Sequence, residues 1–245
     1  MRFLRRIFTI KEVPSVSWSS DFPLNTKPRF YTVIMLITGL FFFGLGEAII
    51  IGSGSGVSPW TVLAQGISIR TDLSVGTTTF LISIGILIFW IPLKQVPGIG
   101  TILNAIIIAS TIDLTLPYLP QPNDTYLKLL QVCIGIFIVG LGSGIYLISN
   151  LGPGPRDGLM IGLQKQTGTS RPLIRTILEL SAVISGWLLG GVVGIGTVLF
   201  VFGWILLGAK VGRFVGKSGK RKEPVPLPPP LTMPGAQAPL LGPTG

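Results

Sequence analysis

Six long apolar stretches alternate with short polar segments along the 245-residue chain. A helix that crosses the hydrocarbon core of a bilayer needs about 20 mostly apolar residues. The six stretches lie at residues 30–51, 77–93, 98–116, 127–149, 172–190 and 195–214. They predict an all-α, polytopic membrane protein with six transmembrane helices. Two further apolar stretches, 57–69 and 154–166, are shorter than a span requires and predict short helices that break or re-enter.

The chain also resembles itself at a fixed offset of 96 residues. The run Gly-Leu-Gly at 44–46 recurs at 140–142, and Gly-Ile-Gly-Thr at 98–101 recurs at 194–197. Such a match indicates an internal duplication. Each copy holds three predicted spans, which is an odd number, so the second copy is expected to enter the membrane upside down. This inverted-repeat plan is common among secondary transporters.

The duplication divides the chain into four parts. Residues 1–29 form a basic N-terminal arm, 30–116 the first membrane repeat and 127–214 the second, and 215–245 a basic, then Pro-rich tail that we expect to be disordered. A second count stays open: if the short helices also cross, there are eight spans and the copies are parallel. The distribution of charged loop residues is compatible with both counts, and the length of the short helices favours six.

A break rich in Gly and Pro precedes each short helix. The break residues are Gly56, Ser58 and Pro59 in the first copy, and Gly152, Gly154 and Pro155 in the second. Pro suits the first position of a helix, and Ser commonly caps the first backbone N–H groups, so we expect Ser58 to cap the helix that follows. The positive end of such a helix favours anions.

Composition narrows the chemistry further. Charged residues make up 11% of the chain and hydrophobic residues 48%, whereas a soluble domain carries roughly 25% charged residues. The chain has no His and one Cys, which excludes His-dependent catalytic triads, His-ligated metals and an intrachain disulfide. We therefore expect no enzyme activity, no catalytic residues, no metal and no cofactor.

The net charge of +10 lies mostly at the two ends. Of the 19 basic residues, six precede residue 30 and six lie between Lys210 and Lys222. Basic residues that flank apolar spans mark the cytoplasmic side of a membrane. The pattern predicts a multi-pass plasma-membrane protein with both termini in the cytoplasm, whose partner is the lipid bilayer and not a nucleic acid.

Five residues in the body are candidates for binding a solute or ion: Glu47, Trp60, Arg156, Asp157 and Glu179. Ionisable groups inside spans are costly and are usually functional or paired. Each candidate also has a structural explanation. Trp60 and Arg156 could anchor at lipid headgroups, and Arg175 and Glu179 share a helix face at the i, i+4 spacing and could neutralise each other.

Glycine repeats mark surfaces where helices approach closely. One runs through Gly186, Gly190 and Gly194, and another through Gly208, Gly212 and Gly216. Such small residues let helix backbones meet. Packing within one chain is the simpler explanation, and homo-oligomerisation is the alternative.

The break motif resembles a known family. Gly-Val-Ser-Pro-Trp at 56–60, preceded by Gly-Leu-Gly at 44–46 and followed by Ser-Val-Gly-Thr at 74–77, is similar to the YczE/YyaS/YitT-like bacterial integral membrane proteins, in particular the YczE branch. The resemblance covers about 30–215. That family usually has an acidic residue after the Trp, where this chain has Thr61, and an acidic residue stands instead at Asp157 in the second copy. The resemblance implies a plasma-membrane protein of uncertain role and supplies no catalytic residues.

Two functions follow from these patterns. The first is a small-solute transporter or permease, with its site near the bilayer midplane where the repeats meet. The alternative is a non-transporting accessory or scaffold protein that acts through its Pro-rich tail. Fold alone does not decide between them.

Overall fold

A computed structural model describes residues 16–203, and all regular elements in this part are helical. The elements are α2 (Phe30–Ser53), α3 (Pro59–Thr71), α4 (Val75–Trp90), α5 (Ile99–Thr115), the 3₁₀ turn η1 (Leu116–Tyr118), α6 (Thr125–Ser149), α7 (Pro155–Thr167) and α8 (Arg171–Leu188). Residues 195–203 begin a further helix. The all-α prediction is confirmed. The first half of the basic arm, the end of the last predicted span and the Pro-rich tail lie outside the described residues.

Among residues 16–203, three helices are long and apolar enough to cross a membrane: α2, α5 together with η1, and α6. Helices α3 and α4 meet at an angle of 113° across a short break, which suits either one broken span or a re-entrant pair. Helix α8 covers the predicted span 172–190 but carries Arg171, Arg175 and Glu179, so its composition alone does not mark it as a span. Many large apolar side chains are exposed, among them Phe30, Phe89, Ile177, Trp187 and Phe202.

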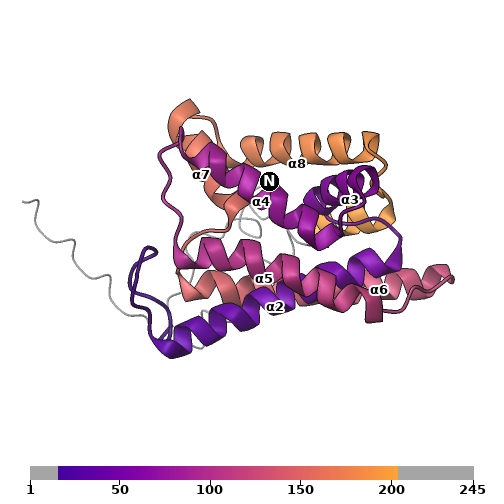
Figure 1. The fold of residues 1–245 in the computed structure, drawn as a ribbon, viewed down its shortest axis with the longest axis horizontal. Coiled ribbons are helices and arrows are strands. Elements are labelled where there is room, and N and C mark those ends of the chain that lie inside the picture. Colours follow the sequence, from indigo (N-terminus) through magenta and orange to yellow (C-terminus); the bar gives the residue numbers. More distant parts are fainter. Residues whose placement is uncertain (1–15, 204–245) are drawn as a thin grey trace, which may run out of the picture.

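The helices form two groups (Figure 1). Helix α2 contacts α5 and α6 in the lower half of that view, and α3 with α8 and α4 with α7 form contacting pairs in the upper half. Contacts between α4 and α5 join the two groups. The short helices α3 and α7 each pack against both α4 and α8.

Helices α2 and α6 pack so closely that only glycine fits at several points. A Cβ atom at Gly39 would lie 2.8 Å from the carbonyl oxygen of Gly142, and one at Gly46 would lie 2.7 Å from that of Gly135. We call these four residues the glycine crossing. Because the pairing runs from 39 with 142 to 46 with 135, the two helices are antiparallel.

The 96-residue offset exchanges the partners of these contacts. Adding 96 to Gly39 gives Gly135, and adding 96 to Gly46 gives Gly142, so each pair of the crossing maps onto the other. A pair of hydrogen bonds behaves in the same way: Gly100 N donates to Leu151 O over 2.7 Å, and Gly196 N donates to Ser55 O over 2.8 Å. The two copies thus contact each other through equivalent surfaces.

Candidate functional site

The two breaks bring the starts of α3 and α7 close to each other, as the contact between Trp60 and Arg156 shows. Before each start the chain turns at a glycine in the left-handed region, with φ of +106° at Gly56 and +114° at Gly152. A side chain is rarely accommodated at such angles, which explains the glycine at both positions. The helices then begin at Pro59 and Pro155, whose fixed φ suits the first helical position.

Trp90, from α4, fixes the start of α7. Its indole Nε1 donates to the carbonyl oxygen of Pro155 over 3.0 Å, and its ring fills the space that a side chain at Gly158 would need. At the equivalent contact in the other half, the large and the small residue have changed places. There Gly186 of α8 stands where Trp90 stands in α4, and it packs on the backbone at Val62 and Leu63.

Ser58 occupies the N-cap position of α3, but its side chain caps none of the helix N–H groups. Its hydroxyl donates instead to Oε2 of Glu47 over 3.0 Å. The prediction that Ser58 caps α3 is therefore wrong. Hydrogen bonds to ionised carboxylates are stronger than those to neutral groups, and the carboxyl group of Glu47 lies within reach of the hydroxyl.

Glu47 is buried in α2, with 2% of its surface exposed. Its Oε2 atom also accepts a hydrogen bond from Thr61 Oγ1 over 2.8 Å, and the hydroxyls of Ser58 and Thr61 are themselves 2.8 Å apart. Its Oε1 atom is buried and has no hydrogen-bond partner among the described residues. One half of this carboxyl group is therefore satisfied and the other half is not, which is a rare and costly arrangement.

Trp60 of α3 and Arg156 of α7 lie against each other. The guanidinium carbon is 5.2 Å from the centroid of the indole ring, a cation–π distance. The two residues occupy equivalent positions of the two copies, since they are 96 residues apart. Arg156 is half-buried and close enough to the carboxyl groups of Glu47, Asp157 and Glu179 to be attracted by them.

Asp157 is held by α6. The Tyr146 hydroxyl donates to Asp157 Oδ2 over 2.8 Å. A Cβ atom at Gly154 would lie 3.4 Å from that hydroxyl, from Asp157 Oδ2 and from Nδ2 of Asn104 on α5. Three polar groups therefore surround Gly154 at the start of α7.

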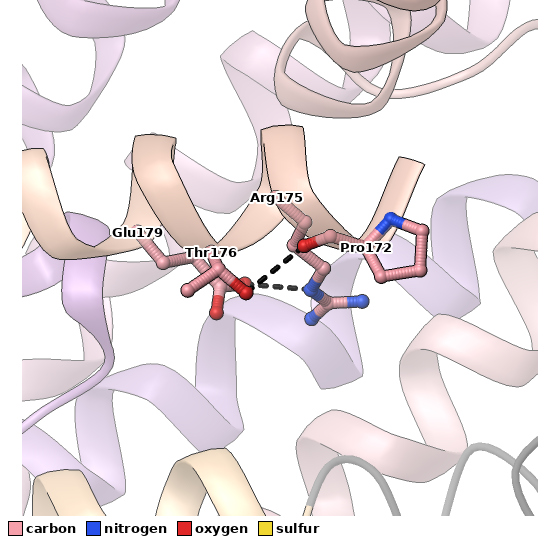
Figure 2. Close-up of polar contacts among 4 residues, drawn as sticks. All are labelled: Pro172, Arg175, Thr176 and Glu179. Atoms are coloured by element: carbon pink, nitrogen blue, oxygen red, sulfur yellow. Dashed lines mark hydrogen bonds and ion pairs between the residues drawn. The ribbon is translucent and has the colours of Figure 1, made fainter. Parts of the chain in front are cut away.

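Glu179 is engaged elsewhere. It forms an ion pair with Arg175 over 2.8 Å, one helical turn away on α8, as Figure 2 shows. The predicted i, i+4 neutralisation is confirmed. Thr176 beside this pair donates to the backbone carbonyl of Pro172 over 2.9 Å and takes no part in it. Glu179 attracts Arg156 but shares no hydrogen bond with the other four candidates.

The structure thus brings four of the five candidates together around the starts of α3 and α7. We call the group the central cluster; it consists of Glu47, Ser58, Trp60, Thr61, Tyr146, Arg156 and Asp157. Ser58 comes from the predicted break, and Thr61 and Tyr146 are additions. Tyr146 could have been found because it aligns with Ile50 at the 96-residue offset, so a polar group breaks the repeat there.

A family match covers the whole of this region. The chain belongs to a family of unknown function (DUF6198), which matches residues 30–213. An uncharacterized protein of Haemophilus influenzae is 41% identical over 191 residues, which are 78% of this chain and 87% of that protein. No solved structure matches the chain.

Two relatives from Bacillus subtilis confirm the predicted resemblance. The uncharacterized membrane protein YczE is 31% identical over 66% of this chain and 76% of its own length. The uncharacterized protein YyaS is 31% identical over 66% of this chain and 83% of its own length. Together with the apolar helices, the relationship to YczE identifies the chain as a membrane protein.

Proposed function

We propose that the protein is a small-solute transporter, without enzymatic activity, whose solute site is the central cluster. The observation that carries the proposal is the contact between Trp60 and Arg156. These equivalent residues of the two copies meet where two short helices begin. In secondary transporters, broken helices with their ends at the repeat interface form the substrate site.

We propose further that the two copies are inverted and cross the membrane three times each, in the plasma membrane, with both termini in the cytoplasm. The antiparallel packing of α2 and α6 supports inversion, because equivalent helices of parallel copies would run in the same direction. The exchange of contacts at the glycine crossing supports it as well. The angle of 113° between α3 and α4 suits a short helix that re-enters.

The polarity of the central cluster supports transport rather than packing alone. Ionisable residues within membrane helices are expensive, and they usually line a pathway or a site. Glu47, Arg156 and Asp157 lie close together while most of the surrounding core is aliphatic. A protein that only needed to pack would place apolar residues here, as it does beside the glycine crossing.

Flux measurements on the full-length protein in proteoliposomes test the proposed function. With a panel of radiolabelled small solutes, we expect uptake of at least one, and a loss of that uptake in Arg156→Ala and in Trp60→Ala. Lys165→Gln, at the exposed far end of α7, is the matched control and should transport normally. Unchanged flux in Arg156→Ala would contradict the site. No flux for any solute would favour the accessory or scaffold role.

Topology is tested separately by thiol labelling. With the exposed native Cys133 replaced by Ser, single cysteines are introduced at Leu73 and Thr169, which are equivalent positions of the two copies. Labelling by a membrane-impermeant reagent from opposite sides would support inversion. Labelling from the same side would favour eight spans with parallel copies.

A further inference from the structure

The hydroxyl and carboxyl oxygens around Glu47 lack one hydrogen. Three short contacts join Glu47 Oε2, Ser58 Oγ and Thr61 Oγ1, at 2.8 to 3.0 Å. Each hydroxyl supplies one hydrogen, and an ionised carboxylate supplies none. Two hydrogens therefore serve three contacts when Glu47 is ionised. When Oε2 of the carboxyl group carries a proton, each contact has a hydrogen and the ring of three bonds is complete.

Around Arg156, hydrogen-bond acceptors are missing instead of hydrogens. A guanidinium offers five N–H donors, yet among residues 16–203 none of them forms a hydrogen bond or an ion pair within 4.0 Å. The guanidinium carbon lies over the Trp60 ring, 5.2 Å from its centroid, and a cation–π contact of this kind consumes none of the N–H donors. The edge of a guanidinium matches the two oxygens of a carboxylate in a bidentate arrangement.

The surrounding charges restrict what binds there. Arg156 faces Glu47 from α2, Asp157 from its own helix and Glu179 from α8, and Glu179 is already paired with Arg175. The groups that α3 and α6 contribute are the hydroxyls of Ser58, Thr61 and Tyr146. With Glu47 ionised, the charges on Arg156, Glu47 and Asp157 sum to minus one, and with Glu47 protonated they sum to zero.

We propose that the central cluster binds a small monocarboxylate anion at Arg156 together with one proton at Glu47. The carboxylate neutralises the guanidinium, which then no longer attracts the charge on Glu47. A proton from solution forms an O–H bond with the Glu47 carboxyl group, completes the ring with Ser58 and Thr61, and leaves again when the anion departs. If the protein transports solutes as proposed above, on which this step rests, the result is electroneutral symport of one anion and one proton.

The same features disfavour other solutes. A cation would leave the N–H donors of Arg156 without an acceptor. A phosphate, with up to two charges, would add a further uncompensated negative charge beside Asp157. The monocarboxylate is the solute whose charge one proton balances.

Proton uptake on binding tests the proposal. Purified full-length protein in weakly buffered detergent solution, with a pH-sensitive dye, is mixed with sodium lactate, benzoate or octanoate. We expect at least one of the three to quench Trp fluorescence. Binding should also take up about one proton per anion, which raises the pH of the medium. Choline chloride, sodium phosphate and zwitterionic glycine should do neither. Quenching by one of these three without any response to the carboxylates would overturn the proposal.

Variants identify the residue that takes up the proton. Glu47→Gln keeps an acceptor for Ser58 and Thr61, so we expect it to fold and to bind the anion without taking up a proton. Arg156→Gln should lose both responses, and Lys165→Gln neither. In infrared difference spectra, a protonated carboxyl band should appear with the anion, disappear in Glu47→Gln and persist in Glu179→Gln. Binding without proton uptake in the unmodified protein, or a proton that remains in Glu47→Gln, would overturn the proposal.

The proposed transport and the proposed binding of an anion with a proton can be refuted independently. Binding with proton uptake but no flux in proteoliposomes would refute transport and still support a site for an anion and a proton. Flux that is abolished by Arg156→Ala but carries no proton would refute the proton site and still support transport.

Discussion

The glycine crossing and the central cluster are both places where the two copies of the repeat meet, and they differ in how far the copies have diverged. At the crossing, identical residues occupy equivalent positions: Gly39 with Gly135, and Gly46 with Gly142. In the cluster, equivalent positions hold different residues: Trp60 with Arg156, Thr61 with Asp157, and Glu47 with Ser143. Backbone contact needs the same small residue on both sides, whereas chemistry needs complementary groups. The 96-residue match is therefore kept at the glycine crossing and lost in the central cluster.

The largest effect is expected at the crossing. In Gly46→Ala, the new Cβ atom would lie 2.7 Å from Gly135 O and from the backbone nitrogen of Val139. We expect the free energy of unfolding to fall by about 2–3 kcal/mol because two backbones have to separate. Denaturant unfolding in detergent micelles measures it. Gly85→Ala in α4, where a Cβ would meet nothing within 4 Å, is the control and should gain up to about 1 kcal/mol. Equal effects of the two variants would show that the crossing is looser than described.

A smaller effect should separate two equivalent threonines. Thr101 accepts a hydrogen bond from Gly98 N and donates one to Pro153 O over 2.7 Å. Among the described residues, Thr197 forms only the first of these bonds, with Gly194 N over 3.3 Å. We expect Thr101→Val to lower the free energy of unfolding by about 2 kcal/mol and Thr197→Val by about half of that. Equal losses, measured by the same unfolding experiment, would mean that the bond to Pro153 contributes nothing.

Exchanging the two residues of the cation–π pair tests the asymmetry of the cluster directly. In the double variant Trp60→Arg/Arg156→Trp, the cation–π contact can form again from the opposite helices, so we expect stability within about 1 kcal/mol of the unmodified protein. Solute flux should nevertheless be lost, because the guanidinium would then project from α3 and no longer from the residue before Asp157. Restored flux would mean that transport needs only the cation–π contact and not the positions of its two residues.

The smallest effect is expected at α8. Arg175 and Glu179 are partly exposed, with 44% and 23% of their side-chain surfaces accessible, and such pairs contribute roughly 0–1 kcal/mol. Glu179→Gln should therefore change the free energy of unfolding by less than about 0.5 kcal/mol and leave flux unchanged. A loss of proton-coupled uptake in Glu179→Gln, with normal insertion, would show that the coupling carboxylate is Glu179 and not Glu47.

Much of this fold could be predicted from the sequence. The apolar stretches and the Gly/Pro breaks place helices close to where the structure has them, because length, hydropathy and helix-start residues are local properties. The 96-residue offset also indicates that Trp60 and Arg156 are equivalent, although not that they touch. The number of crossings depends on how α3 and α4 lie in the bilayer, which hydropathy alone does not determine.

The network within the cluster could not be predicted. Ser58 has the sequence features of a helix cap, and only the approach of Glu47 from another helix explains why its hydroxyl turns away. Asp113 is a similar case: an acidic residue at the end of a span accepts hydrogen bonds from Gly76 N and Thr77 N and thereby caps α4. In both cases the acceptor comes from another helix, which local patterns do not reveal.

The reciprocal hydrogen bonds between the copies have a consequence for biosynthesis. The carbonyl oxygen of Ser55, in the first break, is bonded by the N–H group of Gly196. The ribosome therefore makes the acceptor about 140 residues before its donor. Until the helix that begins at residue 195 is made, this carbonyl oxygen lacks its partner in the finished fold and has to bond to water or to another donor. The nascent chain therefore completes its first half only when its second half arrives.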